Sequence, residues 1–214
     1  MMHPIRLTAI TALLGGSLLA LGFGVSTSFA APISVDVHPL ALNSKIPEQR
    51  TIGKLTYRGG LVISSLTTEF GGLSALGVSA DGERMVALTD RGRRFASQLV
   101  YDEAGNLTGL RRTTLDTMAN IDGTPLMAKS ESDIESMSPG VEGEIIVAFE
   151  RNHRIWRYLP GRIEPEPLRH PTELSRLPAN NGIEGLALLH DGRLFAISKG
   201  LKNMPTTLAW TSGL

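Results

Sequence analysis

Acidic residues and arginines recur at comparable places along this sequence, and together they could bind a cation and an anionic substrate. The acids are Asp90, Glu135, Glu150 and Glu184, and two of them are followed directly by Arg91 and Arg151. Carboxylates that meet in space suit a hard cation such as Ca²⁺, which takes about six to eight oxygen ligands. The planar guanidinium of arginine suits phosphate oxygens. A cation held in this way could also activate a bound water as a nucleophile.

We expect Glu135 and Glu184 to be the catalytic acids, all four acids to contribute metal ligands, and Arg91 and Arg151 to bind the substrate anion. The alternative is that the acids cap strand ends and pair with the adjacent arginines as surface ion pairs, which contribute little to stability. Glu135 and Glu184 stand between apolar residues, where an acid needs a compensating partner. Lys199 interrupts the acidic series, which argues against a symmetric ring of metal ligands.

These places are comparable because the sequence repeats itself. Residues 71–92 and 180–200 share a short apolar run, an Asp-Gly pair and a second run rich in β-branched and aliphatic residues, and residues 132–158 form a weaker middle copy. The Asp-Gly pairs at 81–82 and 191–192 are typical of tight hairpin turns, since glycine adopts the positive φ that such turns require. Each copy therefore predicts a β-hairpin.

Equivalent positions in the three copies form two series. The first series, at the start of the first strand, comprises Ser74, Glu135 and Glu184. The second series, at the end of the second strand, comprises Asp90-Arg91, Glu150-Arg151 and Lys199-Gly200. More strands follow each hairpin, and about four strands in about 50 residues are typical of a β-propeller blade. Equivalent blade positions converge at one mouth of the propeller channel, where we expect the site.

The sequence thus predicts an all-β fold built from four-stranded antiparallel propeller blades. A β-sandwich also has many short strands, but it does not predict the return of one hairpin. A parallel α/β fold needs long helices between strands, whereas the best helix candidates, residues 115–120 and 172–176, are short. At roughly 50 residues per blade, residues 31–214 supply three to four blades. We therefore expect a propeller that is incomplete in this chain.

Composition excludes several other classes of protein. The 214 residues include 21 Lys+Arg, 21 Asp+Glu and no cysteine, so a disulfide framework, a thiolate nucleophile and a cysteine-ligated zinc or iron–sulfur site are excluded. A net charge of zero without a basic block gives no electrostatic footprint for nucleic acid. The sequence has no Gly-x-Ser-x-Gly elbow, no His-Glu-x-x-His zinc motif and no phosphate-binding glycine-rich loop.

Residues 1–30 have the pattern of an export signal. Arg6 precedes the apolar or small residues 7–25, and small residues precede a cleavage site after Ala30. A retained membrane anchor is the alternative, but a Gly-Gly pair interrupts the apolar stretch and no basic stop-transfer cluster follows it. We expect a periplasmic or secreted protein with no stable membrane span after cleavage.

Three blocks of the sequence resemble the family described as esterase-like activity of phytase, also called phytase-like domain proteins. They begin at Phe70 (FGGLSALGVSADGERMVALTDRG), at Asp133 (DIESM, followed by IIVAFERNHRIWRY) and at Leu177 (LPANNGIEGLALLHDGRLFAISKG). The resemblance covers most of residues 52–200 and implies an exported β-propeller that hydrolyses a small-molecule ester or phosphoester. A non-catalytic propeller that binds a ligand or a cell-envelope partner, and a calcium-dependent lactonase-type propeller, remain open alternatives.

Overall fold

The computed structural model describes residues 30–140, 142–200 and 206–213, and in them the regular secondary structure is almost entirely β-strand. It also contains a one-turn helix, α1 (Lys129–Ser132), and a 3₁₀-helix, η1 (Thr172–Arg176). No helix in these ranges is long and apolar enough to cross a membrane. The expected all-β fold of small antiparallel sheets is confirmed. The predicted export signal lies outside the described residues, apart from Ala30.

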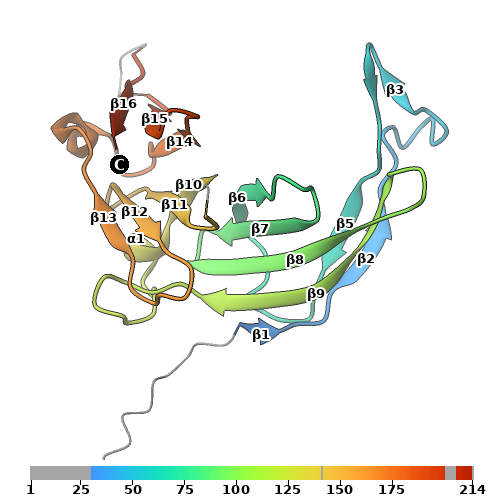
Figure 1. Cartoon of the computed structure of the whole chain (residues 1–214), viewed down its shortest axis with the longest axis horizontal. Helices are drawn as coiled ribbons and strands as arrows, with labels where there is room; N and C mark the ends of the chain where they lie inside the picture. Colours follow the sequence, from blue (N-terminus) through green and yellow to red (C-terminus); the bar gives the residue numbers. More distant parts are fainter. Residues whose placement is uncertain (1–29, 141, 201–205, 214) are drawn as a thin grey trace, which may run out of the picture.

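The first and largest sheet has five strands in the order β1-β9-β8-β7-β6 (Figure 1). Its strands are β1 (Ala31–Pro32), β6 (Leu73–Val78), β7 (Arg84–Thr89), β8 (Arg93–Tyr101) and β9 (Leu107–Thr117). The helix candidate at residues 115–120 is wrong, because its first three residues end strand β9. Leu115 pairs there with Phe95, and both side chains are buried in one apolar cluster, so this burial decides the local structure.

The second sheet is a four-stranded meander and the third sheet has three strands. The second contains β10 (Ile134–Pro139), β11 (Ile145–Phe149), β12 (Arg154–Tyr158) and β13 (Glu166–Leu168). The third contains β14 (Ile183–Leu188), β15 (Arg193–Ser198) and β16 (Ala209–Gly213). Every strand pair in these sheets is antiparallel. The described residues form no closed barrel or propeller, so the blades remain a prediction.

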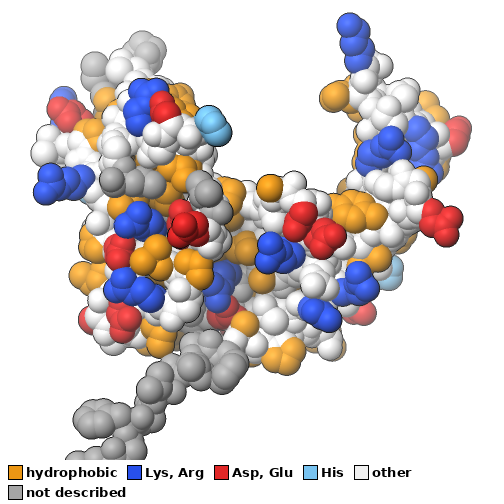
Figure 2. All heavy atoms as spheres, viewed as in Figure 1, with side chains coloured by type: hydrophobic (Ala, Val, Ile, Leu, Met, Phe, Trp, Pro, Cys, Tyr) orange, Lys and Arg blue, Asp and Glu red, His pale blue; other side chains and the backbone are white. Residues whose placement is uncertain are grey.

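Two further strand pairs precede β6 in the chain. They join β2 (Asp36–Pro39) to β5 (Leu61–Ser64), and β3 (Thr51–Ile52) to β4 (Leu55–Thr56). The first of these pairs, β2 with β5, contacts strand β9 of the first sheet. The part around β3 projects away from the sheets, and the surface is hollowed between it and the third sheet (Figures 1 and 2). Its apolar side chains Ile52 and Leu55 are exposed. This projection therefore adds little to the core, which lies among the three sheets.

Strand β11 is buried on both faces, which places the second sheet between the first and the third. Ile145, Val147 and Phe149 pack in the cluster that includes Leu88 of the first sheet. Ile146 and Ala148 pack in the cluster that includes residues of β14 and β15. Side chains alternate across a strand, so a strand that is covered on both faces has an unbroken apolar sequence. The run at residues 145–149 has this form.

Serine hydroxyls join β6, β10 and β14, the first strands of the three hairpins, which lie beside one another. The hydroxyl of Ser74 donates a hydrogen bond to the carbonyl of Ile134 over 2.6 Å, and that of Ser136 donates to the carbonyl of Ile183 over 2.5 Å. Buried polar groups need such partners, because an unsatisfied group costs the free energy of its lost hydration. These bonds link β6 to β10 and β10 to β14, the edge strands at which neighbouring sheets meet.

Replacing Ile146 by alanine should lower the free energy of unfolding by about 2–4 kcal/mol, since a large-to-small change in a core loses both apolar burial and packing. Ile146 is fully buried between the second and third sheets. Chemical denaturation measures the loss. Ile121→Ala, at a side chain that is 52% exposed, is the control and should change stability by less than about 0.5 kcal/mol. Equal effects of the two changes would contradict the packing described here.

Candidate functional site

Each of the three hairpins has a β-bulge at the same place, one residue into its first strand. The strand pairing skips one residue there, so that residue has no partner on the neighbouring strand. The unpaired residues are Ser74, Glu135 and Glu184. A bulge turns its side chain away from the ordinary pleat and is common beside functional sites. The first series of the sequence thus occupies structurally equivalent positions.

The second series is also equivalent in the structure, because each of its first residues makes the same backbone hydrogen bond. Its N–H donates to the carbonyl of the residue that precedes the first strand of the same hairpin. The three bonds are Asp90 to Gly72 (2.9 Å), Glu150 to Asp133 (2.8 Å) and Lys199 to Gly182 (3.1 Å). Both series therefore meet at the same end of each hairpin.

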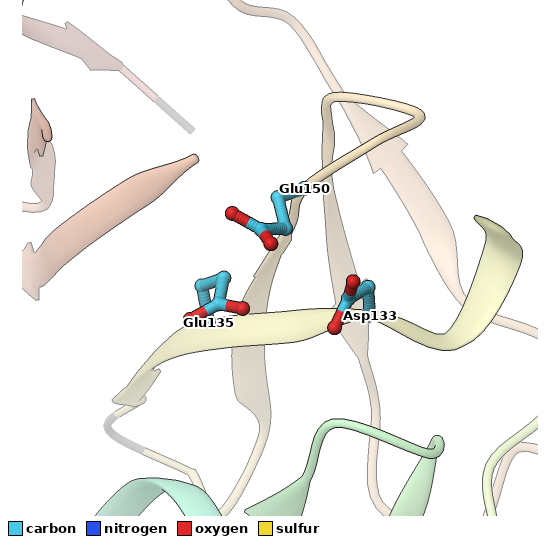
Figure 3. Close-up of side chains that lie close together, drawn as sticks. All are labelled: Asp133, Glu135 and Glu150. Atoms are coloured by element: carbon cyan, nitrogen blue, oxygen red, sulfur yellow. The ribbon is translucent and has the colours of Figure 1, made fainter. Parts of the chain in front are cut away.

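Three carboxylates come together in the second sheet, from Asp133, Glu135 and Glu150 (Figure 3). One oxygen from each lies within 4.8 Å of the others. Asp133 and Glu150 are buried and Glu135 is half-buried. We call these three residues the acidic group; no other set of this kind occurs in the part of the chain that the structure describes. Carboxylate oxygens this close repel one another unless a proton or a cation lies between them.

Asp133 is the member of the acidic group that the sequence reasoning missed. It directly precedes β10, and the corresponding positions before β6 and β14 are Gly72 and Gly182. A side chain at either glycine would collide with the neighbouring series residue: a Cβ at Gly182 would lie 2.7 Å from the Cβ of Glu150. The middle copy has an aspartate where the other two copies have a glycine, and this difference was the signal in the sequence for Asp133.

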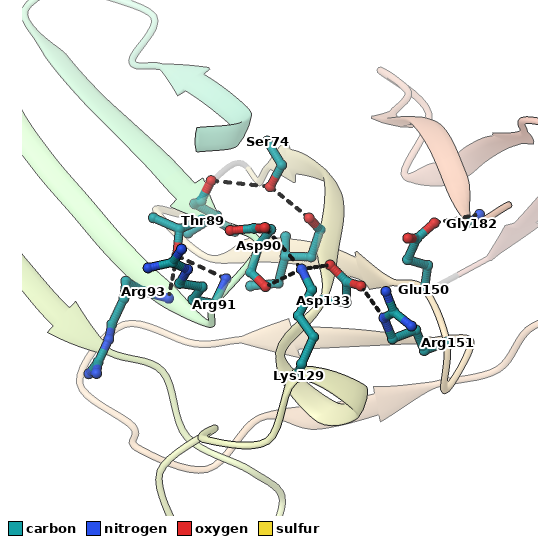
Figure 4. Close-up of polar contacts among 12 residues, drawn as sticks. Ser74, Thr89, Asp90, Arg91, Arg93, Lys129, Asp133, Glu150, Arg151 and Gly182 are labelled. Atoms are coloured by element: carbon teal, nitrogen blue, oxygen red, sulfur yellow. Dashed lines mark hydrogen bonds and ion pairs between the residues drawn. The ribbon is translucent and has the colours of Figure 1, made fainter. Parts of the chain in front are cut away.

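Two cationic side chains hold Asp133, whose side chain is 1% exposed (Figure 4). The amino group of Lys129 lies 2.5 Å from Oδ1, and the Nε of Arg151 lies 2.6 Å from Oδ2. Lys129 also contacts Asp90 over 2.9 Å. Desolvation lowers the pKa of Lys129, but its hydrogen bonds to Asp133 and Asp90 outweigh that effect and raise the pKa above its ordinary value.

Arg151 adopts a backbone conformation that is rare for a residue with a side chain. Its φ is +61°, in the left-handed region that costs roughly 1–2 kcal/mol outside glycine. Its N–H donates to the carbonyl of Ala179 over 2.9 Å, and its guanidinium pairs with Asp133. These bonds keep the guanidinium beside the acidic group. The structure thus places Arg151, one of the two arginines predicted to bind an anion, against Asp133 of the acidic group.

Glu135 is the member of the acidic group whose pKa is raised. Burial, and then the charges of Glu150, Asp133 and Glu184, raise its pKa from 4.5 to about 7. One oxygen of Glu150 accepts the N–H of Gly182 over 3.2 Å. No lysine or arginine pairs with Glu135 or Glu150 among the described residues. The pair can therefore share a proton near neutral pH or contribute oxygens to a cation.

The other predicted site residues lie outside the acidic group. Asp90 contacts Lys129 and does not join the three carboxylates. Glu184 is exposed and lies 3.6 Å from Lys199, although its charge reaches Glu135. Arg91 lies in the turn between β7 and β8 and lines a separate pocket. Lys129 belongs to no repeat, so no pattern in the sequence pointed to it.

Because of Glu135, protein stability should fall as the pH rises from about 4.5 to about 7. The folded chain binds more protons than the unfolded chain in that window, since the pKa of Glu135 is about 7 in place of 4.5. Glu135→Gln stays neutral, so in the presence of a chelator its melting temperature should exceed that of the wild type at pH 8 and approach it at pH 4.5. The exposed control Glu83→Gln should follow the wild type. A gain for Glu135→Gln that is the same at both pH values would contradict the prediction.

Comparison with known proteins adds a family to this geometry. No curated protein matches the chain. A family model described as esterase-like activity of phytase matches residues 68–207, about two thirds of the chain. The match includes all three hairpins, the acidic group and its cationic partners. The chain therefore belongs to the phytase-like family, as its sequence motifs predicted.

Proposed function

We propose that this protein is an exported hydrolase of phosphate or carboxylic esters that depends on a divalent cation, and that its reaction centre is the acidic group. The observation that carries the proposal is the close approach of Glu135 and Glu150, two carboxylates without a cationic partner among the described residues. The family supports ester hydrolysis as the reaction class.

The donor set of the acidic group suits Ca²⁺. Glu135 and Glu150 offer carboxylate oxygens, and a hard cation accepts these together with carbonyls and water. Both oxygens of Asp133 already contact cations, so Asp133 would orient the group while Glu135 and Glu150 bind the metal. When bound, such a cation would lower the pKa of a coordinated water and offset the charge that develops on the ester oxygens.

Glu135 is suited to move a proton during ester hydrolysis. Without a cation its pKa is about 7, and a bound cation would lower that pKa and keep Glu135 ionised, ready to act as a base. As a base, it would accept a proton from the water that attacks the ester phosphorus or carbon; as an acid, it would return that proton to the departing alkoxide. Arg151, fixed by Asp133, would stabilise the negative charge on the non-bridging oxygens.

We also infer that the three sheets are successive blades of a β-propeller. Strands β6, β10 and β14 lie beside one another, and each has a bulge at the same position. Apolar clusters fill both gaps between neighbouring sheets. In a propeller, the acidic group would lie at the channel mouth, where the central strands begin and end. Export through residues 1–30 would place the protein in the periplasm or outside the cell.

Adding Ca²⁺ should raise the melting temperature of the purified protein, because a ligand that binds only the folded state stabilises it. Glu135→Gln and Glu150→Gln should each abolish that increase and lower ester hydrolysis by at least about a hundredfold, the usual contribution of a positioned acid or base. Thermal unfolding with Ca²⁺ or a chelator, and turnover of p-nitrophenyl phosphate and p-nitrophenyl acetate, are the measurements.

Glu184→Gln is the matched control for that experiment. Glu184 occupies the equivalent bulge in the third sheet, but it is exposed and pairs with Lys199. We expect this variant to retain the calcium-dependent increase in melting temperature. A calcium effect in all three variants would place the cation elsewhere. A calcium effect without any turnover would favour a non-catalytic propeller that binds its ligand.

A further inference from the structure

A second polar site lies next to the acidic group, on the other side of Lys129 (Figure 4). It is a surface pocket of about 460 Å³, a size within the usual range for small-molecule sites. Its polar lining comprises Thr68, Glu69, Arg91, Arg93, Lys129 and Ser132. Three cationic side chains thus share the pocket with one carboxylate.

The two arginines give this pocket a net positive charge. Among the described residues neither guanidinium forms a hydrogen bond or an ion pair, although the charge of Arg93 interacts with that of Glu69. A backbone hydrogen bond and the hydroxyl of Thr68 keep the pKa of Glu69 below its ordinary value, so Glu69 is ionised. Lys129 contacts both Asp90 and Asp133, and Asp133 also pairs with Arg151. When these neighbours are counted with the lining, four cationic side chains (Arg91, Arg93, Lys129 and Arg151) face three carboxylates (Glu69, Asp90 and Asp133). The pocket therefore attracts anions.

The turn that carries both arginines is fixed by buried contacts. Thr89 is fully buried, and its hydroxyl accepts the N–H groups of Arg91 over 3.2 Å and Arg93 over 3.1 Å. Gly92 between them has φ +66°, and a Cβ there would lie 2.9 Å from the Cβ of Leu126. A turn held in this way presents the two side chains from a defined backbone, which reduces the entropy lost when they bind a ligand.

We propose that this pocket binds a phosphate group, through Arg91 and Arg93 with Lys129 at its edge. Two planar guanidiniums can each form paired hydrogen bonds to phosphate oxygens, and a doubly charged anion gains more from them than a singly charged carboxylate does. The inference rests on the proposed hydrolase function in one respect: there, the pocket anchors a phosphate group of the substrate beside the reacting ester. Binding of phosphate itself does not depend on turnover.

Calorimetric titration of the full chain with inorganic phosphate, with a chelator present, tests the pocket directly. Phosphate should bind at one site, at least about tenfold more tightly than acetate, and Arg91→Gln with Arg93→Gln should weaken that binding by about tenfold or more, as expected for loss of charge-assisted hydrogen bonds. Arg84→Gln is the matched control: Arg84 is exposed at the start of β7, and its contact with Asp81 is 3.9 Å long. This control should bind phosphate as the wild type does.

Glu69→Gln provides a test of opposite sign that does not depend on the stability of the arginine variants. Removing the one carboxylate of the lining should tighten phosphate binding, because it removes a repulsion from the anion. Absence of phosphate binding, equal binding of acetate, or unchanged affinity in the double arginine variant or in Glu69→Gln would overturn the proposal.

The outcome for the pocket is separable from that for the hydrolase. If phosphate binds through Arg91 and Arg93 but Glu135→Gln has no effect on any turnover, the pocket stands and the reaction centre is wrong. If turnover depends on Glu135 while phosphate affinity is unchanged when both arginines are replaced, the proposed reaction centre stands and the proposed phosphate pocket is wrong.

Discussion

The buried carboxylate of Asp133 is the constraint on which the candidate site depends. A charge with 1% exposure must be paired, since an isolated buried charge costs several kcal/mol. Lys129 from α1 and Arg151 from the turn after β11 supply the pairs, and the carbonyl of Asp133 accepts the N–H of Glu150. One residue thus fixes a helix, a turn and the start of β10. Both cations are bound to Asp133 and none remains for Glu135, whose pKa is raised by burial and then by the charges of the neighbouring carboxylates.

The packing of the sheets explains why this arrangement is held firmly. Strand β11 is covered on both faces, so Glu150 emerges from a strand that cannot slide without exposing apolar side chains on one face or the other. The hydroxyls of Ser74 and Ser136 join β10 to the strands on either side. The bulge at Glu135 then turns one acid toward Glu150 while the rest of β10 keeps its pairing. Rigid strands and one local irregularity together position the two carboxylates.

Much of this structure could be predicted from the sequence, because hairpin turns and alternating apolar residues are local signals. The Asp-Gly turns, the three hairpins and the equivalence of their acids follow from the repeats. Asp133 and Lys129 could not be paired in advance, because their contact depends on how α1 packs on the sheets. The strand at Leu115 was missed for the same reason: its burial against Phe95 outweighs local helix preference. Long-range burial therefore accounts for what the repeats could not indicate.

The three copies also show why the chemistry collects in the middle sheet. Each copy brings its bulge residue near the residue that follows the second strand of its hairpin. In the third copy these positions hold Glu184 and Lys199, which form an ion pair over 3.6 Å and so compensate each other. In the middle copy they hold Glu135 and Glu150, two acids that cannot compensate each other. The two copies have the same backbone arrangement and differ in the residue after the second strand. A lysine there gives a solvent-exposed ion pair, whereas a glutamate there gives a carboxyl pair that can share a proton or a cation. The repeated hairpin supplies the geometry, and its departures from symmetry supply the reactivity.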